Sequence, residues 1–139
     1  MTTLDVGCGN FKRGDIGLDR EPHSNVDVVC DLEREPIPYP DNSFEKVVSY
    51  HFLEHVENPE QVLCEMVRVS RKDILVVVPY RWGYDALGHG HKSVFGFGWF
   101  AQFARKYGLE VRHHYSYAPF LLLIPRPYEL IVELRKKKT

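Results

Sequence analysis

Short segments in which apolar and polar residues alternate recur along the chain, and each has the length of a β-strand. The segments that predict strands are residues 2–6, 15–19, 26–30, 46–50, 74–78, 109–117 and 129–135. Residues 74–78 are apolar without interruption, which fits a strand buried on both faces of a sheet. By contrast, the alternation in 15–19 and 26–30 leaves those two strands apolar on one side only.

Two segments between the predicted strands carry helix signals. Asn58 fits an N-cap, Pro59 the first helical position and Gln61 the third, and apolar residues then recur at helical spacing. A second helix is predicted over 99–107, with Gly108 at its C-terminal cap position. Helices between strands, followed by two strands without a helix between them, predict an α/β fold. We expect a mostly parallel seven-stranded sheet with an antiparallel C-terminal edge strand and helices largely on one face.

The first predicted strand ends in a glycine turn, Gly7-Cys8-Gly9-Asn10. Glycine there indicates either backbone angles barred to other residues or a group that packs directly on the backbone. A turn of this kind is the usual place for an α/β sheet to hold a nucleotide-like ligand. The dinucleotide pattern GxGxxG fails, because Lys12 stands at the third glycine, and this disfavours a nicotinamide-dependent oxidoreductase.

Several motifs, taken in order, resemble those of class I S-adenosylmethionine-dependent methyltransferases. Residues 4–9, LDVGCG, are similar to the first motif of that family. Residues 38–44, PYPDNSF, and 51–56, HFLEHV, are similar to signatures of the subgroup that methylates small molecules and other substrates. The resemblance covers nearly the whole chain. It implies a Rossmann-like fold, S-adenosyl-L-methionine as cofactor, and methyl transfer to an acceptor that the motifs do not identify.

The resemblance also assigns residues to the cofactor. Asp19 matches the acid that ends the second strand and would accept the ribose hydroxyls, while Asp31 and Leu32 look like the adenine-contacting pair. Asp5 would attract the ammonium of the amino-acid end. The expected cofactor-binding residues are Asp5, Gly7, Cys8, Gly9, Asn10, Asp19, Arg20, Asp31, Leu32 and His51. Each acid taken alone is also typical of a solvated turn at a strand end.

Histidines are the candidate general bases. Methyl transfer mainly requires alignment of the reacting atoms, and a base is needed only where the acceptor carries a proton at neutral pH. His91 and His51 are proposed for this role, because imidazole titrates near neutral pH; His51 can instead simply pack beside the cofactor. His91 belongs to a segment rich in glycine and aromatic residues, 80–98, which is interpreted as a lid. No metal site is expected, because the spacing is poor among the histidines at positions 89, 91, 113 and 114.

The connections between the first strands are shorter than in the family. Residues 7–14 and 20–25 leave room for a helical turn at most, whereas a parallel crossover usually needs a dozen or more residues. The family's helix ahead of the first strand also has no counterpart. We therefore expect one sheet face to be bare of helices. Either the segment 119–125 or a second copy of the chain, in a homodimer, would cover it.

Composition restricts the remaining possibilities. A length of 139 residues fits one domain, and 18 Lys and Arg against 19 Asp and Glu create no field that would attract nucleic acid. Three widely spaced cysteines favour a reducing compartment, and the absence of a signal peptide or membrane-length apolar run favours a cytoplasmic protein without membrane contact. The alternative to an enzyme is a catalytically inactive, methyltransferase-fold accessory subunit.

Overall fold

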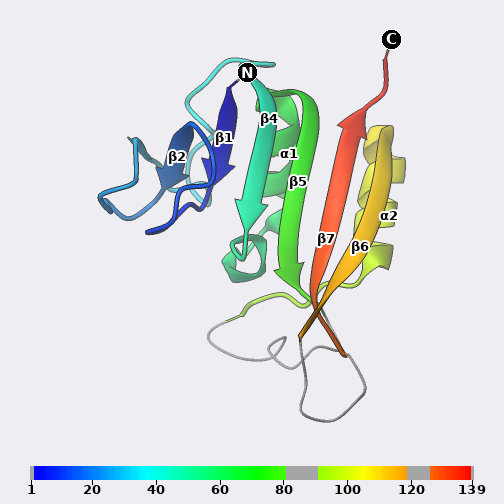
Figure 1. Ribbon diagram of the computed structural model, residues 1–139. Helices are drawn as coiled ribbons and strands as arrows, with labels where there is room; N and C mark the ends of the chain where they lie inside the picture. The colour runs from blue at the N-terminus through cyan, green and yellow to red at the C-terminus, as the bar shows by residue number, and fades with distance from the viewer. Residues whose placement is uncertain (1, 81–90, 119–125, 139) are drawn as a thin grey trace.

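The computed structural model describes residues 2–80, 91–118 and 126–138. The strands in these ranges form one seven-stranded sheet in the order β3-β2-β1-β4-β5-β7-β6 (Figure 1). The strands are β1 (Thr3–Val6), β2 (Ile16–Asp19), β3 (Val28–Val29), β4 (Phe44–Tyr50), β5 (Ser70–Pro79), β6 (Leu109–Ala118) and β7 (Arg126–Lys136). The first five strands are mutually parallel, and β7 is antiparallel to both β5 and β6.

The predicted α/β class is confirmed, with one difference in strand position. The antiparallel strand β7 lies between β5 and β6, so that β6 and not β7 forms the edge of the sheet. The crossover from β5 to β6 runs through α2 (Phe97–Tyr107) and leaves room for one strand between them. The chain then returns and fills that gap with β7.

The capping residues mark the start of α1 and the end of α2 as predicted. In α1 (Pro59–Val69), the Asn58 side chain accepts a hydrogen bond from the Gln61 amide at 3.3 Å. Helix α2 starts two residues before the prediction and ends at Gly108, whose φ of 68° is the left-handed value that favours glycine. None of the helices in the described ranges is long and apolar enough to cross a membrane.

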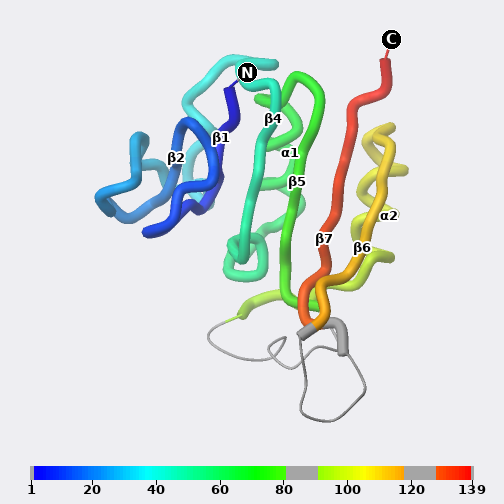
Figure 2. Tube along the Cα trace, in the orientation of Figure 1, coloured from blue at the N-terminus to red at the C-terminus, as the bar shows by residue number. Residues whose placement is uncertain are grey.

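Helices α1 and α2 lie on the same face of the sheet (Figure 1). Helix α1 contacts β4 and β5, and α2 contacts β6 and β7. The alternate β5 residues Ile74, Val76 and Val78 point into the core that these helices close. The tube in Figure 2 passes from β1 through β2 to β3 without a helix, as the short connections predict.

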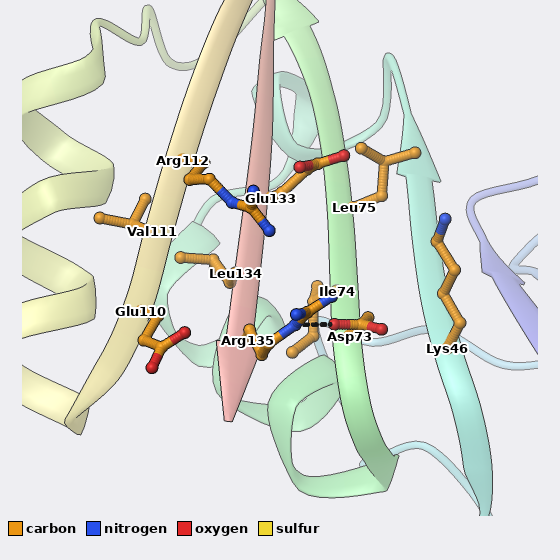
Figure 3. Close-up of a pocket in the computed structure, with 10 residues that line it drawn as sticks. All are labelled: Lys46, Asp73, Ile74, Leu75, Glu110, Val111, Arg112, Glu133, Leu134 and Arg135. Carbon is orange, nitrogen blue, oxygen red and sulfur yellow. Dashed lines mark hydrogen bonds and ion pairs between the residues drawn. The ribbon is translucent and has the colours of Figure 1, made fainter. Parts of the chain in front are cut away.

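The opposite face of the sheet carries a row of charges across four neighbouring strands. Lys46, Asp73, Arg135 and Glu110 stand in register on β4, β5, β7 and β6, and their signs alternate (Figure 3). Arg135 Nε donates to Asp73 Oδ1 at 2.7 Å. This row lines a hollow of about 360 Å³. Charged side chains are compatible with water, so this part of the face needs no covering layer.

One strand is much shorter than predicted. The sequence indicates a strand over 26–30, but only Val28–Val29 pair with β2. Just before that pair, the Asp27 carboxylate accepts from the Gly17 amide at 2.8 Å, and so occupies a donor that a longer ladder would use. The segment 119–125, expected as a cover for the bare face, lies outside the described residues, as do residues 81–90 of the predicted lid.

Candidate functional site

The glycine turn after β1 joins the ends of three strands. The amides of Gly7 and Cys8 both donate to the Leu18 carbonyl, at 2.8 and 3.2 Å, which ties the turn to β2. Gly7 has a φ of 73°, and a Cβ built there would lie 2.2 Å from the Phe52 ring. Phe52 follows β4, so its ring packs directly on the turn. Only glycine satisfies both the backbone angle and this contact.

Asp19, at the carboxyl end of β2, is connected to the same turn. Its Oδ2 accepts from the Gly9 amide at 2.9 Å, and its Oδ1 accepts from the Glu21 amide at 3.1 Å. An ionised carboxylate has about four lone-pair sites, so each oxygen retains capacity for a further donor. The side chain is therefore held in place while it remains able to bind two hydroxyl groups.

Asp31 and Leu32 form the next side of the site, directly after β3. Asp31 Oδ1 accepts from the Glu33 amide at 3.1 Å, and the amides of Arg34 and Glu35 both donate to the Asp31 carbonyl at 3.0 Å. Leu32 is buried in the core beside this turn. A backbone amide two residues away thus holds the Asp31 carboxylate next to the buried Leu32.

These strand ends enclose a pocket of about 370 Å³, which falls in the size range of small-molecule sites. Five of the residues expected to bind the cofactor line it: Gly7, Asp19, Arg20, Asp31 and Leu32. The lining residues outside the expected cofactor-binding set are Leu18, Cys30, Glu33, Phe52, His55, Val56 and Lys92. Three of these belong to the HFLEHV motif, which could have suggested them; Lys92 has no signal in the sequence.

The other expected cofactor residues do not line this pocket. Asp5 is 1% exposed; its Oδ2 accepts from the Arg13 amide at 2.7 Å, and its Oδ1 has no hydrogen-bond partner among the described residues. Burial raises the pKa of Asp5, and the Arg13 amide and guanidinium only partly oppose this. Cys8 is buried beneath the turn, which raises its pKa to about 11. The Asn10 carbonyl accepts from the Asn25 side chain, and thereby braces the same loop.

His51 stands at the carboxyl end of β4 with an unusual backbone. Its φ is 52°, a left-handed value for a residue other than glycine, and its amide donates to the Val77 carbonyl at 2.8 Å. The Nε2 atom is hydrogen-bonded to Glu129 Oε2, while Glu129 Oε1 accepts from the Ser116 hydroxyl at 2.8 Å. Burial raises the pKa of Glu129, but the hydrogen bonds from His51 and Ser116 outweigh it and lower the pKa overall.

Because an ionised Glu129 accepts the hydrogen bond, it favours a proton on His51 Nε2, and Nδ1 is then the acceptor nitrogen. His91, the other expected base, lies instead against His55, with ring centroids 4.9 Å apart. The two candidate bases therefore belong to different side-chain groups.

Residues 4–78, more than half of the chain's length, match the family model described as a methyltransferase domain. The chain belongs to the methyltransferase-domain family. It is 33% identical over 78 residues to ajmaline N-methyltransferase of Rauvolfia serpentina, a match that covers 56% of this chain and 22% of that protein. This methyltransferase domain thus spans about a fifth of the length of that curated relative.

Solved structures agree on the fold. An S-adenosylmethionine-dependent methyltransferase from Archaeoglobus fulgidus superposes with a TM-score of 0.78 at 16% identity, over 96% of this chain and 85% of that one. A Haloferax volcanii methyltransferase, solved in complex with the Trm112 methyltransferase activator, gives 0.71 at 16% identity, over 96% and 81%. At these identities the likeness concerns the fold alone.

S-adenosyl-L-methionine is the cofactor that this family implies, and the residues present fit it. The pocket lies at the carboxyl ends of parallel strands, where α/β sheets bind nucleotides. Asp19 offers acceptors for a diol, and Gly7 lines the pocket with the Phe52 ring packed on it. Asp5 is buried and does not line the pocket, although its Oδ1 has no partner among the described residues.

Proposed function

We propose that this methyltransferase domain binds S-adenosylmethionine in the pocket formed by the ends of β1, β2 and β3, and transfers its methyl group to an acceptor. When bound, the cofactor supplies a methyl carbon activated by positive sulfur. The observation that carries the proposal is the convergence of Gly7, Asp19 and Asp31 on one pocket from three separate strand ends. Asp19 would accept the ribose hydroxyls and Asp31 the adenine amino group, whereas Asp5 is buried outside the lining of this pocket.

His51 is the residue best placed to remove a proton from the acceptor. Strand β4 lies next to β1 in the sheet, so His51 follows the strand end adjoining the glycine turn. Glu129 holds the imidazole through Nε2, so that Nδ1 is the nitrogen that would take the proton from the acceptor. Because His51 is not a glycine, its positive φ is a strained backbone conformation, of the kind that occurs at functional sites.

Titration calorimetry with S-adenosylhomocysteine, the product form of the cofactor, tests the pocket. We expect micromolar binding to the parent chain and a loss of at least about tenfold in Asp19→Ala, because a charge-assisted hydrogen bond contributes about 1.5–3 kcal/mol. The matched control is Asp15→Ala, just before the amino end of β2, where the carboxylate accepts from the Thr3 amide at 2.8 Å and does not line this pocket. Equal binding by both variants would contradict the assignment of Asp19.

A second candidate is an accessory subunit or a domain that needs a partner. The helix-free connections between β1, β2 and β3 favour it, because less of the chain supports the glycine turn. The solved Haloferax volcanii methyltransferase in complex with an activator shows that a similar fold can work with another chain. A folded parent chain that binds no S-adenosylhomocysteine, even when soluble and pure, would favour this candidate.

We also propose a reducing, cytoplasmic environment, in which the free thiols of Cys8, Cys30 and Cys64 persist. A homodimer would have to avoid the row of alternating charges and use the half-buried Leu75 beside it, because Val77 on the same face is only 4% exposed. Light scattering across a concentration series tests this: a constant monomer mass would exclude the dimer.

A further inference from the structure

Three potential metal ligands meet next to the proposed cofactor pocket. They are Glu54, His55 and His91, and one ligand atom of each lies within 4.8 Å of the ligand atoms of the other two. Glu54 is 1% exposed, and His55 Nε2 is 3.5 Å from Glu54 Oε1. The rings of His55 and His91 meet edge to face at 4.9 Å. His55 also lines the pocket, so the group is part of its wall.

The backbone brings these residues together independently of their side chains. Glu54 and His55 belong to the short helix η1 (Leu53–His55), which follows β4. The carbonyl of Glu54 accepts from the amides of Lys92 and Ser93, at 2.7 and 3.1 Å. These bonds fix the segment that carries His91 against η1. A substitution of the Glu54 side chain therefore leaves the attachment of this segment in place.

We propose that Glu54, His55 and His91 bind a divalent first-row transition-metal ion. Two imidazoles and one carboxylate suit Mn²⁺, Fe²⁺, Co²⁺ and Zn²⁺ better than Mg²⁺ or Ca²⁺, which prefer oxygen ligands throughout. Three protein ligands leave open positions on the ion, as in catalytic rather than structural sites. The histidine spacing in the sequence does not indicate this metal site.

The geometry requires only a small contraction. Ligand atoms around a tetrahedral ion lie about 3.4 Å apart, given metal–ligand distances of about 2.0–2.2 Å. From 4.8 Å, each donor atom has to move inward by about 1 Å, which side-chain rotations supply. The nearby ammonium of Lys92 is directed to Glu57 at 2.6 Å, so its charge is balanced outside the group. A cation among the three side chains would in turn neutralise the buried Glu54.

Cobalt titration of the intact chain, without S-adenosylmethionine, tests the proposal. Co²⁺ has a visible absorption that reports ligand number and geometry, so binding is read directly and independently of the cofactor. We expect one Co²⁺ per chain, and at least about tenfold weaker binding in His91→Gln and Glu54→Gln. The control is His114→Gln, an exposed histidine on β6. Its affinity is expected to equal that of the parent.

Two results would overturn the metal site. One is a folded parent chain with no new visible band at millimolar Co²⁺. The other is a His91→Gln variant that binds Co²⁺ as tightly as the parent while circular dichroism shows it to be folded. Neither result depends on S-adenosylhomocysteine binding, so the metal site and the cofactor pocket are tested independently.

Discussion

Gly7→Ala tests whether the glycine turn depends on the Phe52 ring or on backbone freedom alone. Gly7 and Gly9 both have positive φ, at 73° and 52°. Their surroundings differ, because a Cβ at Gly7 would meet the Phe52 ring at 2.2 Å, whereas a Cβ at Gly9 would meet nothing within 4 Å. Gly9→Ala therefore isolates the backbone cost, and Gly7→Ala adds the collision to it.

The magnitudes follow from these two contacts. The left-handed backbone costs a residue with a Cβ about 1–2 kcal/mol, at either position. Carbon atoms in contact normally lie about 3.5–4.0 Å apart, so the Phe52 ring would have to move by more than about 1 Å. Displacement of this kind in a packed site costs about 1–3 kcal/mol. We expect Gly7→Ala to lose about 2–5 kcal/mol of unfolding free energy, and Gly9→Ala about 1–2 kcal/mol.

Urea denaturation of five chains measures the difference: the parent, Gly7→Ala, Gly9→Ala, Phe52→Gly, and Gly7→Ala combined with Phe52→Gly. Glycine at position 52 removes both the ring and its Cβ, which would lie 2.6 Å from the new Cβ, so the cost of Gly7→Ala should fall to that of Gly9→Ala when each is referred to its own background. Equal losses for the two glycine variants in the parent background would refute the argument. They would mean that Phe52 can leave the turn freely, and that the pocket wall is not fixed by this contact.

Two further predictions concern the N-cap of α1 and the Glu129 carboxylate that is hydrogen-bonded to His51. Asn58→Ala should lower the unfolding free energy by about 1 kcal/mol, because α1 loses its side-chain cap, whereas Asn58→Ser should retain most of it; urea denaturation checks both. Glu129 has a lowered pKa, so its contribution to stability is present above its unfolded-state pKa and is lost as the pH falls through the folded-state value. Between neutral pH and about pH 3, the melting temperature of the parent should therefore fall more than that of Glu129→Gln; parallel curves would contradict the assigned hydrogen bonds.

Local signals predicted most of the fold. Apolar alternation indicated most strands because the sheet is apolar on its helix side, and an uninterrupted apolar run indicated β5. Asn58 marked the start of α1 and Gly108 the end of α2, because capping contacts are local. The predicted extent of β3 was wrong because the Asp27 carboxylate accepts a hydrogen bond from the Gly17 amide. The alternation of apolar and polar residues does not report such a contact. The position of β7 inside the sheet depends on how a crossover spaces two strands, which is a property of tertiary packing.

The candidate site was predictable only where the sequence motif and the pocket wall coincide. Asp19 and Asp31 follow strands, so their position at the sheet edge could be inferred. Phe52 lines the pocket because its ring packs on Gly7. Lys92 lines it because its amide donates to the Glu54 carbonyl and holds the segment there. Both contacts join segments distant in sequence, and no local pattern reports them.

The charged row on the helix-free face explains how a methyltransferase domain with short crossovers keeps its sheet intact. A sheet normally covered on both faces would expose apolar residues if one helix layer were absent. Here Lys46, Asp73, Arg135 and Glu110 alternate in sign across four strands, so each charge has an opposite neighbour in the ladder. On the same face, Glu133 and Arg112 continue the charges beside Leu75, and Val77 is buried. The face is thus adapted to water across β6 and β7 as well as along this row, which is why the sheet stays intact there without a second helix layer.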